Sequence, residues 1–313
     1  SAAIQAFRGK KDINVYILHP HNRVSEVQRR QMTTVEDDNI FNIAIKGNFD
    51  DCQKIVKELF VDESLQQYTS LTAINSINWA RLIAQVVYYF WAYLQIDRKE
   101  INFIVPSGNF GNVFSANVAK KMGLPIKKLH IATNQNDILH SSINNGVMKK
   151  NIVKQTYSPS MDIQISSNFE RQLFESTGRN SESIKNLFQE FSKNNSYTFD
   201  KKTLDDLRSI YSTNTVNDEE TLSTINKVKK EYNYLADPHT STGLHALIDK
   251  DINHPWVSLA CAHPAKFGDA IEKAVGHRPV MPKDLSKLFD KQEKITILDN
   301  SKKDLKSLIL SNI

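Results

Sequence analysis

The sequence contains little cysteine and no long apolar run, and each shortage excludes a class of protein. Only two cysteines occur among 313 residues, Cys52 and Cys261, and they stand far apart. Two distant thiols form neither a disulfide framework nor a zinc site, which favours a reducing cytoplasmic environment. The longest apolar stretch, 82–94, is too short for a membrane span and contains Gln85. We therefore expect no membrane segment. The histidines show no metal-ligand spacing, so we expect no metal site either.

An excess of charge of one sign is lacking as well. Forty basic and 35 acidic side chains leave a formal charge of +5, and no Lys/Arg block is long enough to bind nucleic acid. The first residues do not have the pattern of a secretory leader. We therefore expect a soluble cytoplasmic protein without a nucleic-acid or membrane signal, whose function must be inferred from local motifs.

Strand and helix signals alternate along most of the chain. Short β-branched runs predict strands at 13–18, 42–45, 101–106, 128–133, 256–261 and 295–298. Apolar periodicity predicts helices between them, at 25–32, 49–60, 76–94, 111–122, 241–248 and 267–275. Such alternation is typical of an α/β fold with a parallel sheet. The polar stretch at about 165–235 has helical patterns and no clear strand, so it predicts a helical insertion.

The most informative segment runs Val-Pro-Ser-Gly-Asn-Phe-Gly-Asn at 105–112, between a predicted strand and a predicted helix. Open α/β sheets bind ligands at the carboxyl ends of their strands. Two glycines would allow the backbone to approach a ligand, and the N–H groups at the helix start attract anions. The segment lacks the spacing of a Walker A loop or a complete dinucleotide fingerprint. It predicts a phosphate site, with a tight turn that binds nothing as the alternative.

This segment resembles the pyridoxal-phosphate (PLP) loop of the threonine synthases, in the long form found in bacteria and fungi. Four further segments resemble the family in the same order, at 47–52, 75–81, 132–134 and 262–267. The resemblance extends from residue 1 to at least residue 276. It implies a fold type II PLP enzyme, similar to the tryptophan synthase β subunit, with parallel-sheet domains covered by helices on both faces. The implied reaction converts O-phospho-L-homoserine and water to L-threonine and phosphate.

The resemblance also implies which residues bind the cofactor. The phosphate of PLP would be bound by Ser107, Gly108, Asn109, Phe110, Gly111 and Asn112. Cys261 stands where the family usually has a threonine that faces the pyridine nitrogen. A thiol is a weaker hydrogen-bonding group than a hydroxyl, so this position is a departure from the family pattern.

Substrate binding is implied for a second set of residues: Asn75, Ser76, Asn78, Arg81, His263 and Lys266. A dianionic phosphate favours a guanidinium together with hydroxyl and amide donors near a helix start, which Ser76 is predicted to provide. Each residue also has a simpler interpretation. Asn75 and Ser76 could only cap a helix, and Arg81 could be a surface ion-pair residue. His263 and Lys266 could be a turn histidine and a lysine at a helix start.

The catalytic lysine of the family stands in a Phe-Lys-Asp context, upstream of the segment that resembles residue 1. No lysine of this chain has that context, so we assign none to the Schiff base. We expect an N-terminally truncated, monomeric fragment that is inactive by itself and exposes apolar surface and a sheet edge. Residues 1–70 would be the remaining part of a small mobile cofactor domain, and 71–313 the large PLP-binding domain. The alternatives are a catalytically inactive protein that binds phosphate-bearing ligands and a related PLP phospho-lyase.

Overall fold

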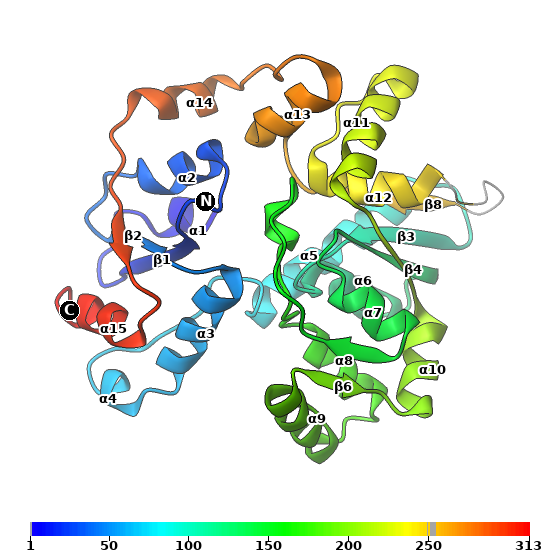
Figure 1. Ribbon diagram of the computed structural model, residues 1–313, viewed down its shortest axis with the longest axis horizontal. Helices are drawn as coiled ribbons and strands as arrows, with labels where there is room; N and C mark the ends of the chain where they lie inside the picture. The colour runs from blue at the N-terminus through cyan, green and yellow to red at the C-terminus, as the bar shows by residue number, and fades with distance from the viewer. Residues whose placement is uncertain (1, 249, 251–254) are drawn as a thin grey trace. The chain divides into compact units, whose positions relative to one another are not determined.

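The computed structural model describes residues 2–248, 250 and 255–313, so Ser1 lies outside the described residues. The chain divides into two compact units (Figure 1). The first consists of Ser1–Ala73, Ala265–Gly268 and Arg278–Ile313, and the second of Ile74–Pro264 and Asp269–His277. Each unit has its own sheet and core.

The first unit contains a parallel three-stranded sheet with β2 in the middle. Its strands are β1 (Val15–Pro20), β2 (Ile40–Ile45) and β9 (Thr296–Leu298). Its helices include α1 (Ala2–Phe7), α2 (Glu26–Thr33), α3 (Phe49–Phe60), α4 (Glu63–Gln66), α14 (Lys283–Ser286) and α15 (Lys302–Leu310). Successive strand residues face opposite sides of a sheet. Ile43 accordingly packs with Ile55 and Leu305, whereas Ile40 packs with Ile4, so helices cover both faces.

The C-terminal segment belongs to this first unit, which differs from the predicted division at residue 70. β9 pairs with β2, and Glu293 accepts hydrogen bonds from Arg29 Nε at 2.8 Å and from the Thr33 hydroxyl at 2.6 Å. These contacts join residues more than 250 positions apart. A segment of short elements at the end of a chain does not show in its own sequence which sheet it will join.

The second unit contains a four-stranded parallel sheet of order β7-β4-β3-β8. The strands are β3 (Ile101–Pro106), β4 (Ile126–Thr133), β7 (Tyr211–Thr215) and β8 (Trp256–Ser258). The main helices around it are α5 (Trp79–Leu94), α6 (Gly111–Lys121), α8 (Phe169–Ser176) and α12 (Pro238–Ile248). Phe103 faces the core that α5, α6 and α8 cover, whereas Ile104 on the same strand faces α12. Helices on both faces confirm the predicted α/β architecture.

The stretch expected to be purely helical is partly sheet, and the prediction that it contains no strand is wrong. Its helices are accompanied by β7, which pairs with β4, and by β6 (Ser196–Thr198), which pairs with β5 (Val147–Lys149). The other helices of the unit are α7 (Ile138–Asn144), α9 (Ser181–Asn194), α10 (Lys201–Ile210), α11 (Asp218–Tyr232) and α13 (Gly268–Val275). β7 reads Tyr-Ser-Thr-Asn-Thr, and an edge strand this polar gives no apolar signal.

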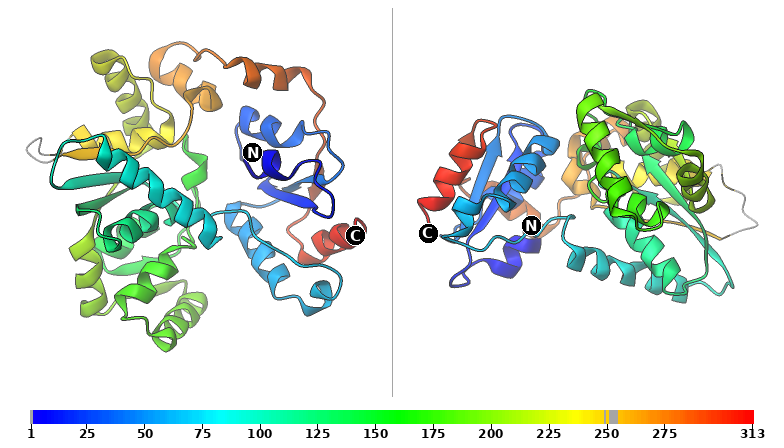
Figure 2. Two further views of the ribbon diagram at one scale, coloured as in Figure 1. Left: turned by 180° about the vertical axis from the view of Figure 1, so that it is seen from behind. Right: turned by 90° about the horizontal axis from the view of Figure 1, so that it is seen from below.

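Helix α5 has one buried face and one large exposed apolar face. Leu82 and Tyr89 are buried, whereas Val87, Trp91 and Leu94 are each more than half exposed. The helix lies in the foreground when the molecule is seen from behind (Figure 2). That apolar surface and a sheet edge are exposed because of a missing segment stays a prediction. At 16 residues α5 is not a membrane span, and no helix in the described part of the chain is long and apolar enough for one.

Candidate functional site

The predicted cofactor residues lie at the carboxyl edge of the second sheet. β3 and β8 are neighbouring parallel strands, so the loop after β3 and the segment that leads to Cys261 leave the sheet at the same edge. The main chain stays paired beyond β8, because Leu259 N–H donates to Ile104 O at 3.0 Å. Open parallel sheets bind ligands at this edge, which supports the predicted location of the site.

Phe110 shapes the turn into α6. It has φ 61°, in the left-handed region, and is the N-cap of α6 without a side-chain cap. A bulky residue persists in this conformation only where its surroundings enforce it. The ring is fully buried and packs against Phe169 and Tyr211, with ring centroids 5.1 and 5.5 Å apart. The first N–H groups of α6 have no carbonyl partner within the helix, so the turn provides donors for an anion.

Packing against protein leaves little room for a side chain at the two glycines of the loop. A Cβ at Gly108 would lie 3.0 Å from Met161 Cα and 3.2 Å from Ser160 O. At Gly111 it would lie 3.1 Å from Leu82 Cδ2. The sequence predicts that these glycines allow the backbone to approach a ligand, which stays a prediction; the structure shows that a Cβ at either position would crowd neighbouring protein atoms. The loop conformation is therefore fixed from the protein side.

Hydrogen bonds hold the rest of the loop. Ser107 N–H donates to Ala132 O at 2.9 Å, and the Ser166 hydroxyl donates to Gly108 O at 2.8 Å. The buried Tyr89 hydroxyl lies 2.8 Å from both the carbonyl and the side-chain oxygen of Asn112. With its carbonyls bound from the protein side, the loop has little freedom to rearrange.

The predicted substrate-phosphate segment forms the entrance to α5. The helix begins at Trp79 with Asn78 as its N-cap, so the prediction that Ser76 opens the helix is wrong. Asn78 Oδ1 accepts from Ala80 N–H and Asn75 Oδ1 from Ile77 N–H, each at 2.9 Å. These two side-chain oxygens stabilise the local turn before the helix. This is close to the simpler interpretation, in which Asn75 only caps a helix.

Arg81 lies beside this segment, and among the residues that the structure describes it has no ion-pair partner. Its guanidinium Nη1 donates to Ile74 O at 2.8 Å, and the residue is exposed. The remaining guanidinium N–H groups can bind an anion, because an arginine carries five such donors. Arg81 thus lies next to Asn75 and Asn78, and its binding of a phosphate stays a prediction.

Asn168, which the sequence did not single out, joins the two predicted phosphate segments. It is 1% exposed, and its Nδ2 donates to Ser76 O at 2.9 Å and to Asn109 O at 3.1 Å. Its Oδ1 accepts from Arg171 Nε, and the Arg171 guanidinium also donates to Ile77 O. The predicted substrate segment and the predicted cofactor loop therefore lie side by side. No sequence signal marks Asn168, which is one polar residue among many in its stretch.

Cys261 is held by its main chain, with its N–H donating to Thr240 Oγ1 at 2.8 Å. Solvent reaches the side chain, but the protein atoms packed around it desolvate the thiol. Desolvation of the thiol by these atoms, together with the charge of Asp237, raises the pKa of Cys261 to about 12. The thiol is therefore neutral at physiological pH and can act as a weak donor.

The last two candidates lie in different units. His263 is an exposed residue of the second unit, whereas Lys266 lies in the short helix Pro264–Phe267 and belongs to the first. The contribution of both residues to substrate binding stays a prediction.

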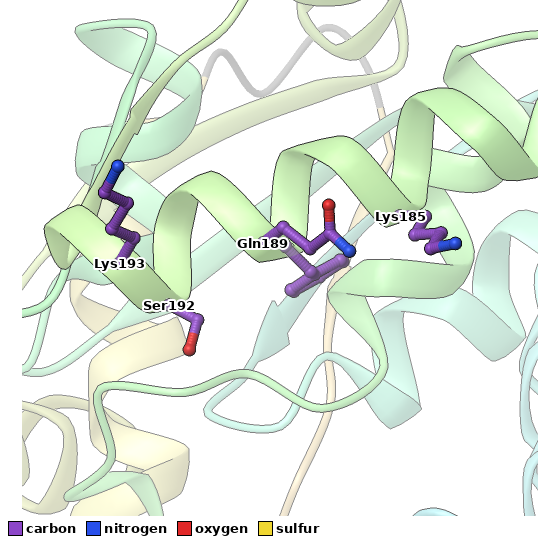
Figure 3. Close-up of a pocket in the computed structure, with 5 residues that line it drawn as sticks. Lys185, Gln189, Ser192 and Lys193 are labelled. Carbon is purple, nitrogen blue, oxygen red and sulfur yellow. The ribbon is translucent and has the colours of Figure 1, made fainter.

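A different hollow lies on α9, lined by Lys185, Phe188, Gln189, Ser192 and Lys193 (Figure 3). All five residues come from one helix, and none of them is a candidate from the sequence. Among the described residues, no group of three or more His, Cys, Asp or Glu side chains could hold a metal ion. The carboxyl edge of the second sheet is therefore a better candidate for the functional site than the hollow on α9.

The fold defined by these elements is that of the fold type II PLP-dependent enzymes. A family model described as "Threonine synthase, C-terminal" matches residues 240–309. The threonine synthase of Pseudomonas aeruginosa is 45% identical over 305 residues, covering 96% of this chain and 65% of that protein. The threonine synthase of Methylobacillus glycogenes is 40% identical, covering 100% of this chain and 68% of the relative.

Solved structures agree with these matches. The PLP-bound threonine synthase from Brucella melitensis is similar with a TM-score of 0.88 and 45% identity, covering 98% of this chain and 67% of that one. The yeast threonine synthase follows with a TM-score of 0.86 and 39% identity, covering 100% and 68%. This chain belongs to the threonine synthase family. It spans about two thirds of the length of its relatives, and only 65% of the one from P. aeruginosa.

Proposed function

We propose that this chain forms the larger part of a threonine synthase, which converts O-phospho-L-homoserine and water to L-threonine and phosphate. The observation that carries the proposal is the junction made by Asn168. It bonds the segment at 75–78 and the loop at 107–112, each of which the family resemblance assigns to a phosphate group. An enzyme that brings a phosphorylated substrate to a phosphorylated cofactor needs two anion sites side by side.

The residues present fit PLP. The turn at 107–112 offers the uncapped N–H groups of α6, and packing holds it in place through Phe110, Gly108 and Gly111. Cys261, on the neighbouring segment of the same sheet edge, would face the pyridine nitrogen through its neutral thiol. PLP supplies an electron sink that makes protons next to the amino group of a bound amino acid removable.

On the substrate side, the chain provides donors and orientation. Arg81 would bind the substrate phosphate with its remaining N–H groups. The hydroxyl of Ser76 and the amide groups of Asn75 and Asn78, on the segment just before it, would add hydrogen bonds. Charge-assisted hydrogen bonds of this kind also favour departure of the phosphate as a dianion. His263 and Lys266 are further proposed contacts.

In this family a lysine binds the cofactor covalently, and we assign that role to no lysine of this chain. We therefore propose that turnover requires family sequence beyond these 313 residues. The cytoplasmic location and the monomeric state expected from the sequence stay predictions.

The test joins the chain to the remaining, N-terminal part of the P. aeruginosa relative and supplies PLP and O-phosphohomoserine. We expect threonine and phosphate in equal amounts, and neither product from the 313 residues alone. Borohydride reduction should attach the cofactor to a lysine of the added segment. Cofactor binding without either product would favour the inactive phosphate-binding alternative. Phosphate release from O-phosphothreonine but not from O-phosphohomoserine would identify a phospho-lyase instead.

A further inference from the structure

Asp237 is a buried carboxylate next to the proposed site, and each of its two oxygens accepts two hydrogen bonds. Its Oδ1 accepts from the main-chain N–H of His239 at 2.9 Å and from His239 Nδ1 at 3.0 Å. Its Oδ2 accepts from the Thr240 hydroxyl and from Ala262 N–H, the latter at 3.1 Å. Burial raises the pKa of Asp237, but the hydrogen bonds from His239 and Thr240 outweigh it and hold the pKa below its ordinary value. The group is ionised.

His239 extends this arrangement toward the phosphate loop. Its Nε2 accepts the main-chain N–H of Ser160 at 3.2 Å. A nitrogen that accepts an N–H carries no proton, so the ring proton resides on Nδ1 and faces Asp237. Ser160 belongs to the turn at 159–161, whose main chain packs directly on Gly108. The Asp237–His239 pair thus supports the cofactor loop from behind.

Thr240 extends it toward the opposite side of the site. Its hydroxyl donates to Asp237 and accepts the N–H of Cys261 at 2.8 Å. Together with the Ala262 N–H bond, this fixes two successive peptide groups at the position expected to face the pyridine nitrogen. One carboxylate therefore holds the main chain at both ends of the proposed cofactor site.

We propose that Asp237 and His239 are positioning residues that keep the 159–161 turn and the 261–262 segment at the spacing the cofactor needs. They touch neither cofactor nor substrate, and they set the cofactor affinity through the main chain. This inference rests on the proposed function, because it deepens the assignment of the same site. All contacts that carry it lie within the second unit.

Three substitutions separate the two directions of support. His239→Asn keeps an amide N–H near the Nδ1 position and removes the acceptor of Ser160 N–H. His239→Gln places an acceptor near the Nε2 position and removes the donor to Asp237. Thr240→Val keeps the shape of the side chain but removes the acceptor of Cys261 N–H.

His130 provides a matched control. It is buried on β4, with Nδ1 2.8 Å from Ser212 Oγ and Nε2 3.0 Å from Asn214 Oδ1. His130→Asn therefore also removes a hydrogen bond from a buried histidine. It is not part of the proposed site, so it measures the effect of lost stability alone.

The probe is 4′-deoxypyridoxine 5′-phosphate, in which a methyl group replaces the aldehyde, so that it binds without bonding to lysines. Calorimetric titration of the 313-residue chain gives the affinity, and hydrogen exchange gives the protection of the Ser160 and Cys261 amides. We expect His239→Asn to weaken binding about tenfold and to deprotect Ser160, and His239→Gln to restore most of both. Thr240→Val should deprotect Cys261 and leave Ser160 protected.

Unchanged affinity and unchanged Ser160 protection in His239→Asn would overturn the inference. So would an equal loss of affinity in His130→Asn, because the effect would then follow from stability alone. If His239→Asn does not fold, the other two variants decide: His239→Gln should keep the Ser160 amide protected, and Thr240→Val should deprotect Cys261 alone. Deprotection of Ser160 in His239→Gln, or an unchanged Cys261 amide in Thr240→Val, would then overturn the inference. Failure of the unmodified chain to bind the probe would count against the proposed function, while the amide protection pattern would still test the positioning.

Discussion

Replacement of Asn168 by alanine should uncouple the two proposed phosphate segments. The buried amide Nδ2 is the side-chain donor to both Ser76 O and Asn109 O, and its oxygen accepts from Arg171 Nε at 3.1 Å. Asn168→Ala removes all three bonds. The main-chain N–H of residue 168 still donates to Asn109 O at 3.1 Å. The Ser76 carbonyl, in contrast, loses the hydrogen bond from residue 168 completely.

The magnitude follows from this inventory. A buried carbonyl that loses its donor costs about 1–3 kcal/mol, and an ordinary lost hydrogen bond about 1 kcal/mol. For Ser76 O together with the bonds to Asn109 and Arg171, we expect the free energy of unfolding to fall by about 2–4 kcal/mol. Both anion sites should weaken together, because the segment at 75–78 and the loop at 107–112 lose their common support.

Urea unfolding and calorimetric titration of the whole chain measure the two effects, with 4′-deoxypyridoxine 5′-phosphate and O-phosphohomoserine as separate probes. Asn180→Ala is the control, because Asn180 Oδ1 caps α9 by accepting from Ser183 N–H at 3.0 Å. Loss of that cap costs about 1 kcal/mol of stability and should leave both affinities unchanged. An Asn168→Ala variant that loses less than about 1 kcal/mol and binds both probes normally would refute the reasoning.

Three further predictions concern packing, the pyridine contact and acid stability. Gly108→Ala should abolish probe binding, because its Cβ would meet main-chain atoms at 3.0 and 3.2 Å; Gly178→Ala, at φ 71° with nothing within 4 Å, should lower stability and spare binding. Cys261→Thr should strengthen probe binding in the same titration, since a hydroxyl is the better hydrogen-bonding group; weaker binding would count against the pyridine contact. The hydrogen bond from Arg29 lowers the pKa of Glu293 from 4.5 to about 2, so its stabilisation is present above pH 4.5 and lost toward pH 2. Glu293→Gln should therefore be less stable than the parent in urea at pH 7 and equally stable near pH 2; a difference independent of pH would contradict this.

Elements whose signals are local could be predicted from the sequence. α3 spans Phe49–Phe60 as expected, because Asn48 and Asp51 form a capping box and the apolar face is regular. β3 spans Ile101–Pro106 as expected, because its six residues are buried on both faces and almost all apolar. The turn at 107–112 could be predicted in the same way, since it lies between β3 and α6; its role as a phosphate loop stays a prediction.

Features that depend on distant partners could not be predicted. β7 is polar and becomes a strand only by pairing with β4, and the segment at 278–313 joins the first unit through β2. Asn168 acquires its role from two carbonyls that are 92 and 59 positions away in the chain. The sequence predicts a start of α5 that is too early, because Ser76 and Asn78 are both good capping residues and only the structure shows that Asn78 is the cap.

The most direct measurement is a titration of the 313-residue chain, uniformly labelled with ¹⁵N, with 4′-deoxypyridoxine 5′-phosphate, followed through the amide shifts of the loop at 107–112. If the loop binds the cofactor phosphate, the amides of Gly111 and Asn112 at the uncapped start of α6 should shift most, and inorganic phosphate should move the same signals. Binding that shifts other regions and leaves these amides unmoved, or no binding at all, would contradict the assignment of this loop as the cofactor site.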